Sequence, residues 1–318
     1  MAAGPSVRIG ISSCLLGHPV RYDGGHKRDA FLVDTIGPHV TWVPVCPEEE
    51  AGMGTPREPM RLVRADGRLR LLGVRSATDH TPVLDGWAAR RVEQLAREDL
   101  DGYILKKDSP SCGLDRVKVY NAHLAPARTG RGLFADALVA RLSKLPVEEE
   151  GRLCDPRLRE NFVERVFAYR RLRTFFTGRW TVSGLVHHQA AHKLTLLSHS
   201  PDACRTLGRL VARAKDLPRA EVRATYEDGF MRCLATLATP RKHVNVLQHM
   251  LGYFRGVLDA DSRAELAGAI ADYRRGLVPL VVPLTLLRSQ VRRCRVTYLA
   301  GQTYLEPHPK ELMLRNHV

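Results

Sequence analysis

The chain has 318 residues, and its hydrophobic content of 44% is ordinary for a globular protein of about two domains. The longest apolar stretch, residues 277–287, is interrupted by Pro279 and Pro283, and the first ten residues lack the apolar core of a signal peptide. We therefore expect no membrane span and a cytoplasmic location, where seven widely spaced cysteines favour metal binding or catalysis over a disulfide framework.

The positive charge is concentrated in the second half of the chain. Residues 1–150 contain 21 Lys and Arg against 20 Asp and Glu, whereas residues 151–318 contain 28 against 14. Nearly all of the net charge of +15 therefore comes from the second half. Solvated helical surfaces usually balance their charges, so a two-to-one excess favours a polyanionic partner.

Strand and helix patterns alternate in the first half. Apolar and β-branched residues predict strands at 7–11, 40–45 and 102–105, and apolar residues at helical spacing predict a helix at 85–98. Strand, helix and strand in succession imply parallel pairing. We therefore predict an α/β domain with a parallel, Rossmann-like sheet.

A domain boundary is predicted near residues 145–155, where the acidic run 148–150 interrupts the pattern. We assign residues 1–148 to the first domain and 149–318 to an all-α domain. Its helix starts are marked by a capping residue followed by proline, at Asp155–Pro156, Ser200–Pro201 and Thr239–Pro240.

Three cysteines of the first half follow predicted strands or the turns after them: Cys14, Cys46 and Cys112. In open parallel sheets, ligands bind at the carboxyl edge, where these cysteines can converge. Structural zinc sites and closed iron–sulfur clusters use four protein ligands, so three would leave one metal position open. None of the three belongs to a CxxC pair, which argues against a zinc ribbon. The cysteines in or near helical patterns are expected to be small buried side chains: Cys154, Cys204, Cys233 and Cys294.

The first half resembles the thiouracil desulfurase family over roughly residues 6–145. Five motifs occur in the family's order: SCLLG at 13–17, VRYDG at 20–24, VPVCPE at 43–48, TPREP at 55–59 and SPSCG at 109–113. This resemblance implies a 4Fe–4S cluster held by Cys14, Cys46 and Cys112, with its fourth iron free of protein. It also places the family's catalytic acidic residue and serine at Glu48 and Ser109.

The second half resembles a YbgA-like helical domain that is often fused to the first. The whole arrangement is similar to prokaryotic RNA desulfidases, which remove sulfur from 4-thiouridine in tRNA. We therefore expect hydrolysis of a thiolated pyrimidine in tRNA, with release of sulfide. The soft thiocarbonyl sulfur would bind the open iron, and Glu48 would transfer a proton. The basic clusters expected to contact phosphate are Arg170, Arg171, Arg173, Arg179, Arg241, Lys242, Arg292, Arg293 and Arg295.

Two other functions stay open. A desulfidase of free thiouracil or a thionucleoside would act without RNA, although a small neutral base needs no domain of charge +14. A non-enzymatic iron–sulfur redox sensor that binds nucleic acid would need four ligands or no open iron. The sequence does not indicate the oligomeric state.

Individual residues also allow simpler interpretations. Glu48 could be a solvated carboxylate in an acidic run, and Ser109 a turn serine before proline. The loop 21–23 either contacts base or phosphate or forms a plain turn. His188 and His192 have the spacing of a metal pair on a helix, but no third ligand is apparent, so we favour core or RNA-surface histidines.

Overall fold

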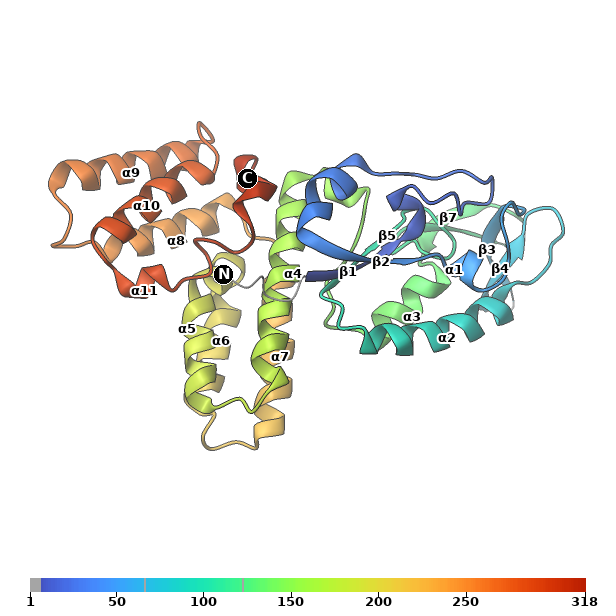
Figure 1. Cartoon of the computed structure of the whole chain (residues 1–318), viewed down its shortest axis with the longest axis horizontal. Coiled ribbons are helices and arrows are strands. Elements are labelled where there is room, and N and C mark those ends of the chain that lie inside the picture. The colour runs from blue at the N-terminus through green and yellow to red at the C-terminus, as the bar shows by residue number, and fades with distance from the viewer. Residues whose placement is uncertain (1–6, 66, 122) are drawn as a thin grey trace. The chain divides into compact units, whose positions relative to one another are not determined.

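The computed structural model describes residues 7–65, 67–121 and 123–318, and the chain divides into two compact units, Met1–Cys154 and Asp155–Val318 (Figure 1). The first unit contains a parallel sheet with helices, and the second is largely helical, so the predicted fold class is confirmed. Within the described residues, no helix is long and apolar enough to cross a membrane.

A four-stranded parallel sheet forms the centre of the first unit, in the order β2-β1-β5-β8. Its strands are β1 (Val7–Ser12), β2 (Val40–Val45), β5 (Gly102–Leu105) and β8 (Val147–Glu149). Three of them coincide with the predicted strands. β1 and β5 are almost wholly buried, which explains their continuous apolar character.

Two helices pack side by side in this unit, α2 (Thr81–Arg97) and α3 (Leu133–Arg141) (Figure 1). Phe134 of α3 contacts both Trp87 of α2, at 5.4 Å between ring centroids, and Tyr103 of β5, at 5.9 Å. The Tyr103 ring lies so close to Gly10 that a Cβ there would approach it to 2.2 Å. The sheet therefore needs glycine at this position to accept the aromatic layer.

A second sheet of four strands was not predicted. Its order is β4-β3-β6-β7, and it pairs β3 (Met60–Ala65) with β4 (Arg68–Gly73) and β6 (Val117–Tyr120) with β7 (Pro126–Gly130). Leu62 and Leu71 are fully buried on this sheet, whereas Arg64 and Arg68 are exposed. The Arg and Leu residues of β4 thus alternate with the two-residue period that is typical of a half-buried strand.

The acidic run 148–150 belongs to the first unit, which corrects its interpretation as a break in the pattern. Glu148 and Glu149 lie in β8, which pairs with β5. Glu149 Oε1 accepts the Leu114 amide at 2.7 Å, and Glu150 Oε2 accepts the Lys107 amide at 2.7 Å. These carboxylates serve as hydrogen-bond acceptors for the loop that follows β5.

The second unit consists of seven long helices and one short one, within the described residues. They are α4 (Pro156–Thr177), α5 (Val182–His199), α6 (Pro201–Ala212), α7 (Arg219–Ala235), α8 (Pro240–Gly252), α9 (Ala260–Arg275), α10 (Val281–Arg293) and the short α11 (Thr297–Ala300). The predicted caps at Asp155, Ser200 and Thr239 each accept a backbone amide of the first helical turn.

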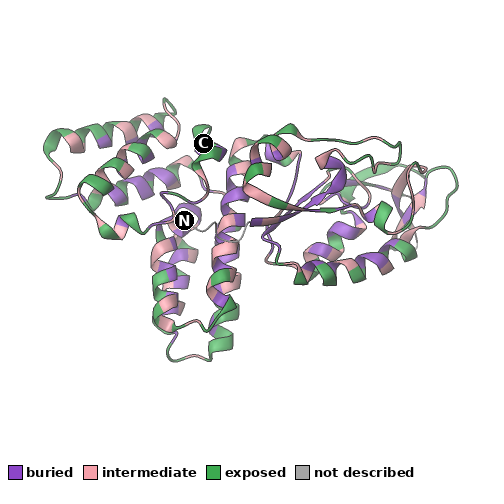
Figure 2. Ribbon diagram, in the orientation of Figure 1, coloured by how far each residue is buried: buried purple, intermediate pink, exposed green. Residues whose placement is uncertain are grey.

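The helical unit has two apolar cores (Figure 2). Helices α4 to α7 enclose one around Phe176, Tyr226 and Phe230, and the later helices enclose another around Phe254 and Tyr304. The remaining short elements are a π-helix at Phe31–Ile36, α1 (Pro47–Glu50), and 3-10 helices at Ser13–Leu16, Gly37–His39, Arg152–Cys154, Lys310–Leu312 and Leu314–Asn316.

Candidate active site

Three turns at the carboxyl edge of the parallel sheet carry the three cysteines. Cys14 lies in the 3-10 helix that follows β1, Cys46 caps α1 directly after β2, and Cys112 lies in the turn after β5. Gly17, with φ of 98°, ends the first turn by donating its amide to the Cys14 carbonyl. The structure brings all three side chains to one cavity of about 340 Å³.

The cysteines fit a group that contains several metal atoms. Burial raises the pKa of Cys14 to about 11, with Cys46 adding to the effect, and burial also raises the pKa of Cys46 and Cys112. Buried thiolates need nearby positive charge, which bound metal supplies. Three thiols that line one cavity are the kind of ligand that iron–sulfur clusters use.

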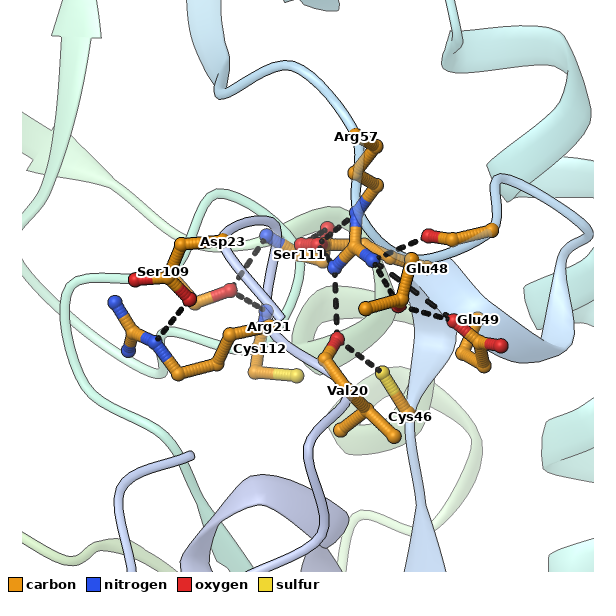
Figure 3. Close-up of polar contacts among 12 residues, drawn as sticks. Val20, Arg21, Asp23, Cys46, Glu48, Glu49, Arg57, Ser109, Ser111 and Cys112 are labelled. Carbon is orange, nitrogen blue, oxygen red and sulfur yellow. Dashed lines mark hydrogen bonds and ion pairs between the residues drawn. The ribbon is translucent and has the colours of Figure 1, made fainter. Parts of the chain in front are cut away.

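Glu48 lies on the same cavity and is held at both carboxylate oxygens (Figure 3). Oε1 accepts a hydrogen bond from Ser111 Oγ at 2.8 Å. Oε2 accepts the Arg57 Nε–H at 3.0 Å and pairs with the rest of that guanidinium. The Glu48 side chain is 15% exposed, so it is a largely buried carboxylate in a defined orientation rather than a solvated one.

Arg57 connects the Glu48 carboxylate to two loops through hydrogen bonds. It donates to the carbonyls of Gly54, at 2.7 Å, and Val20, at 3.2 Å. The Cys46 thiol contacts the same Val20 carbonyl at 3.8 Å (Figure 3). Any change at Arg57 would therefore reach both Glu48 and the loop behind Cys46.

The two serines of the SPSC motif have different contacts. Ser109 lines the cavity, and its Oγ accepts the amides of Ser111 and Cys112 at 3.2 and 3.1 Å, which shapes the turn that presents Cys112. Ser111 is the serine that contacts Glu48. Sequence reasoning missed Ser111 and the role of Arg57. The available signal was their place in the SPSCG and TPREP motifs.

The mouth of the cavity carries an aromatic ring and several cations. Tyr22 is 41% exposed, and the Arg21 guanidinium lies 5.6 Å from its ring centroid and 3.6 Å from Asp23. Lys27 and Lys107 line the same cavity and are exposed. A planar group would find an aromatic ring and exposed charged side chains here.

The predicted phosphate contacts fall into two groups. Arg171 points inward, donating to His192 Nε2 at 3.2 Å and to the Pro307 carbonyl at 2.9 Å, and Lys242 donates to the His199 carbonyl. Both are therefore used inside the helical unit. Arg170 and Arg173 are half-buried, and the Arg173 guanidinium lies 5.8 Å from the centroid of the Tyr169 ring. The exposed members of the set are Arg179, Arg241, Arg292, Arg293 and Arg295.

His188 and His192 are core residues, one of the two alternatives that we favoured over a metal pair because no third ligand is apparent. Their rings stack at 4.2 Å, His188 contacts the Tyr226 hydroxyl at 3.0 Å, and His192 contacts the His188 carbonyl at 2.8 Å. Burial lowers the pKa of His188 to about 4, so it is neutral near pH 7.

The four cysteines outside the cavity differ in burial. Cys204 and Cys233 are buried as predicted, and Cys294 packs against the second core. Cys154 is exposed, which corrects the prediction for this residue. It lies in the short 3-10 helix between β8 and α4, not in a helical core.

Comparisons with known proteins give family matches to both units. The model of the 2-thiouracil desulfurase family matches residues 9–150, and that of the family described as protein of unknown function DUF1722 matches residues 193–309. YbgA of Escherichia coli (strain K12) is 33% identical over 156 residues, which are 48% of this chain and 90% of that protein. YbbK of Bacillus subtilis (strain 168) is 31% identical over 134 residues, 40% of this chain and 87% of that protein.

One solved structure is also similar to part of the chain. It is the [4Fe-4S]-dependent thiouracil desulfidase TudS, with 29% sequence identity and a TM-score of 0.38. The similarity covers 47% of this chain and 94% of that one.

Proposed function

Because this chain belongs to the 2-thiouracil desulfurase family through residues 9–150, and to the DUF1722 family through residues 193–309, we propose that it is a 4Fe–4S-dependent desulfidase that converts 4-thiouridine in tRNA to uridine. The family match supports an enzyme over a redox sensor. The observation that carries the proposal is the single cavity lined by Cys14, Cys46, Cys112 and Glu48.

Cys14, Cys46 and Cys112 would hold the cluster. Bound there, it supplies a Lewis-acidic iron without a protein ligand, to which the soft sulfur of a thiocarbonyl can bind. The protein provides the walls of the site: two of the thiols are at most 8% exposed, and Val45, Pro47 and Pro110 line the same cavity. Such walls exclude bulk water from around the reacting carbon.

Glu48 is the proton-transfer group in this proposal. Water adds to the ring carbon, its protons pass through the carboxylate, and sulfur departs as sulfide. Thiocarbonyl and water thus become carbonyl and hydrogen sulfide, with no net transfer of electrons. Arg57 and Ser111 fix the two carboxylate oxygens, so Glu48 meets the attacking water in one orientation.

Two observations support RNA as the substrate. The second half of the chain carries a net charge of +14, and a neutral free base gains nothing from such a field. At the cavity mouth, Tyr22 offers a ring for a nucleobase, and Lys27 and Lys107 offer charge for neighbouring phosphates. A base in tRNA would have to leave its stack to enter the cavity.

The cytoplasm is the proposed site of action. All seven cysteines of the chain lie in described segments, and all are free thiols. Free thiols are the rule in reducing compartments.

The family description names 2-thiouracil, which favours free thiouracil as the alternative substrate. The two substrates are separated by anaerobic incubation of the cluster-loaded protein with 4-thiouridine-containing tRNA or with 2-thiouracil. Sulfide release and nucleoside composition are then measured. We expect turnover of the tRNA, and none with Glu48→Gln protein of equal iron content. Turnover of 2-thiouracil with intact 4-thiouridine in the tRNA would refute the tRNA proposal.

A further inference from the structure

A groove of about 590 Å³ lies on the helical unit, lined by residues of α5, α6, α8 and α11 and by Tyr253. Its apolar lining includes Leu194 and Leu197 of α5 and Val211 of α6. α5 contacts both α6 and α8, so the groove has a rigid floor (Figure 1 locates these helices). No residue of the groove takes part in the chemistry proposed above.

Two tyrosines form the aromatic part of the groove. Tyr253 directly follows α8, and Tyr298 lies in α11. Their ring centroids are 4.9 Å apart with an interplanar angle of 18°. Burial, with a hydrogen bond to Tyr253, raises the pKa of Tyr298 to about 12, so its hydroxyl is neutral near pH 7. Tyr253 is 45% exposed despite this stacking, which leaves ring surface for a further planar group.

The charged side chains of the groove have one sign. Lys193 and Arg205 line it and are exposed, and no Asp or Glu occurs among its described lining residues. Arg205 does pair with Asp202, but both side chains of that pair are at least 70% exposed, so the attraction is weak. A purely apolar occupant would leave these cations without a counter-charge, and a small inorganic anion would leave the tyrosines unused.

We propose that this groove binds an unpaired nucleotide of single-stranded RNA, its base stacked on Tyr253 and its phosphates beside Lys193 and Arg205. Stacking on an aromatic ring beside a basic track is how single strands are held without dependence on sequence. The proposal rests on the function proposed above, and it names a surface of the helical unit by which the RNA substrate is held.

The test measures fluorescence anisotropy of a labelled oligouridylate with the full-length protein. Tyr253→Ala should weaken binding by roughly five- to a hundred-fold, the effect typical of losing one stacked base, whereas Tyr253→Phe should bind like wild type. Lys193→Glu should weaken binding and reduce its salt dependence. The matched controls lie outside the groove, Leu277→Ala for an exposed apolar side chain and Arg274→Glu for a charge reversal, and should have no effect.

Sulfide release from thiolated tRNA separates this proposal from the proposed function. If wild type desulfurates tRNA while Tyr253→Ala and Lys193→Glu keep both oligouridylate affinity and KM for tRNA, the groove proposal is overturned and the function stands. If oligouridylate binding depends on Tyr253 but thiolated tRNA is not desulfurated, the groove stands and the function falls. Should Tyr253→Ala abolish self-association in sedimentation and leave RNA affinity intact, the occupant is a second copy and the proposal is overturned.

Discussion

At the scale of single residues, Glu48 combines burial with two fixed contacts. Ser111 and Arg57 each hold one carboxylate oxygen, so the orientation of the group is set before substrate arrives. Motif position located Glu48 and the three cavity cysteines from the sequence. It did not identify Ser111 as a partner, because that contact joins residues 63 positions apart and depends on how two turns meet.

Glu48→Gln should retain the iron–sulfur spectrum and lose roughly 10²–10⁴-fold in kcat, the usual contribution of a general acid–base group. Glu93→Gln is the matched control, because Glu93 is an exposed glutamate of α2 that is likewise paired with an arginine, Arg141. Iron content and sulfide release are measured on the same preparations. Wild-type turnover by the Glu48 variant would remove this residue from the mechanism.

Single replacement of Cys14, Cys46 or Cys112 by Ala should abolish cluster binding and activity, since a cluster with only two protein ligands is poorly held. Cys204→Ala is a buried control and Cys154→Ala an exposed one, and both should keep wild-type iron. The measurement is iron and sulfide per chain after anaerobic reconstitution. A full cluster in the Cys112→Ala protein would contradict the ligand assignment.

At the scale of elements, local signals were reliable where they were complete within a few residues. Asp155 and Ser200 were located as caps because serine or aspartate followed by proline is a local sequence signal for the start of a helix. β8 was missed because its Glu149 suits a buried strand only once the amide of Leu114, 35 positions away, is brought against it. The second sheet was missed for a similar reason, since its central pair, β3 with β6, joins distant segments.

The buried histidines of α5 and α8 should make the helical unit sensitive to acid. Burial, assisted by Arg171, lowers the pKa of His188 to about 4, and burial with Arg315 lowers that of His243 to about 3. The unfolded chain takes up these protons near pH 6.5, so stability falls as the pH drops from 6.5 towards 4. His199 has the opposite effect on the pH dependence of stability, because Glu164 helps to raise its pKa.

A pKa difference of this size lowers the free energy of unfolding by about 3 kcal/mol for one histidine as the pH falls from 7 to below 4. Thermal unfolding followed by circular dichroism should therefore show a falling midpoint between pH 7 and pH 4. His188→Gln should reduce the slope, because glutamine can occupy the position beside Tyr226 without titrating. An equal slope in that variant would show that His188 is not responsible.

At the scale of the whole molecule, positive charge is concentrated in the second half of the chain. The first half has a net charge of +1 and the second +14, a division visible from the sequence alone. Which basic residues are available was not visible, because the inward orientation of Arg171 and Lys242 depends on packing against other helices. We therefore expect the exposed arginines to be the residues that contact phosphate.

Reversing Arg241, Arg292 and Arg293 to Glu should weaken tRNA binding and lower the slope of log affinity against log salt by about one for each phosphate that is no longer neutralised. The iron–sulfur spectrum should not change. Arg64→Glu, an exposed charge reversal on β3, is the control from the other unit. If the triple variant keeps the wild-type salt slope, these arginines do not contact phosphate.

The overall reaction should be hydrolytic, because the site holds a carboxylate, Glu48, that can transfer protons. Arg57 and Ser111 fix the orientation of a carboxylate that can relay protons, and exchange of a thiocarbonyl for a carbonyl requires no electrons from outside. Turnover in isotopically labelled water should therefore place heavy oxygen in the product base, without an external reductant. Mass spectrometry of the released nucleoside checks the label. A strict requirement for a stoichiometric electron donor, or a product without the label, would assign the chemistry to reductive desulfuration and leave Glu48 without its role.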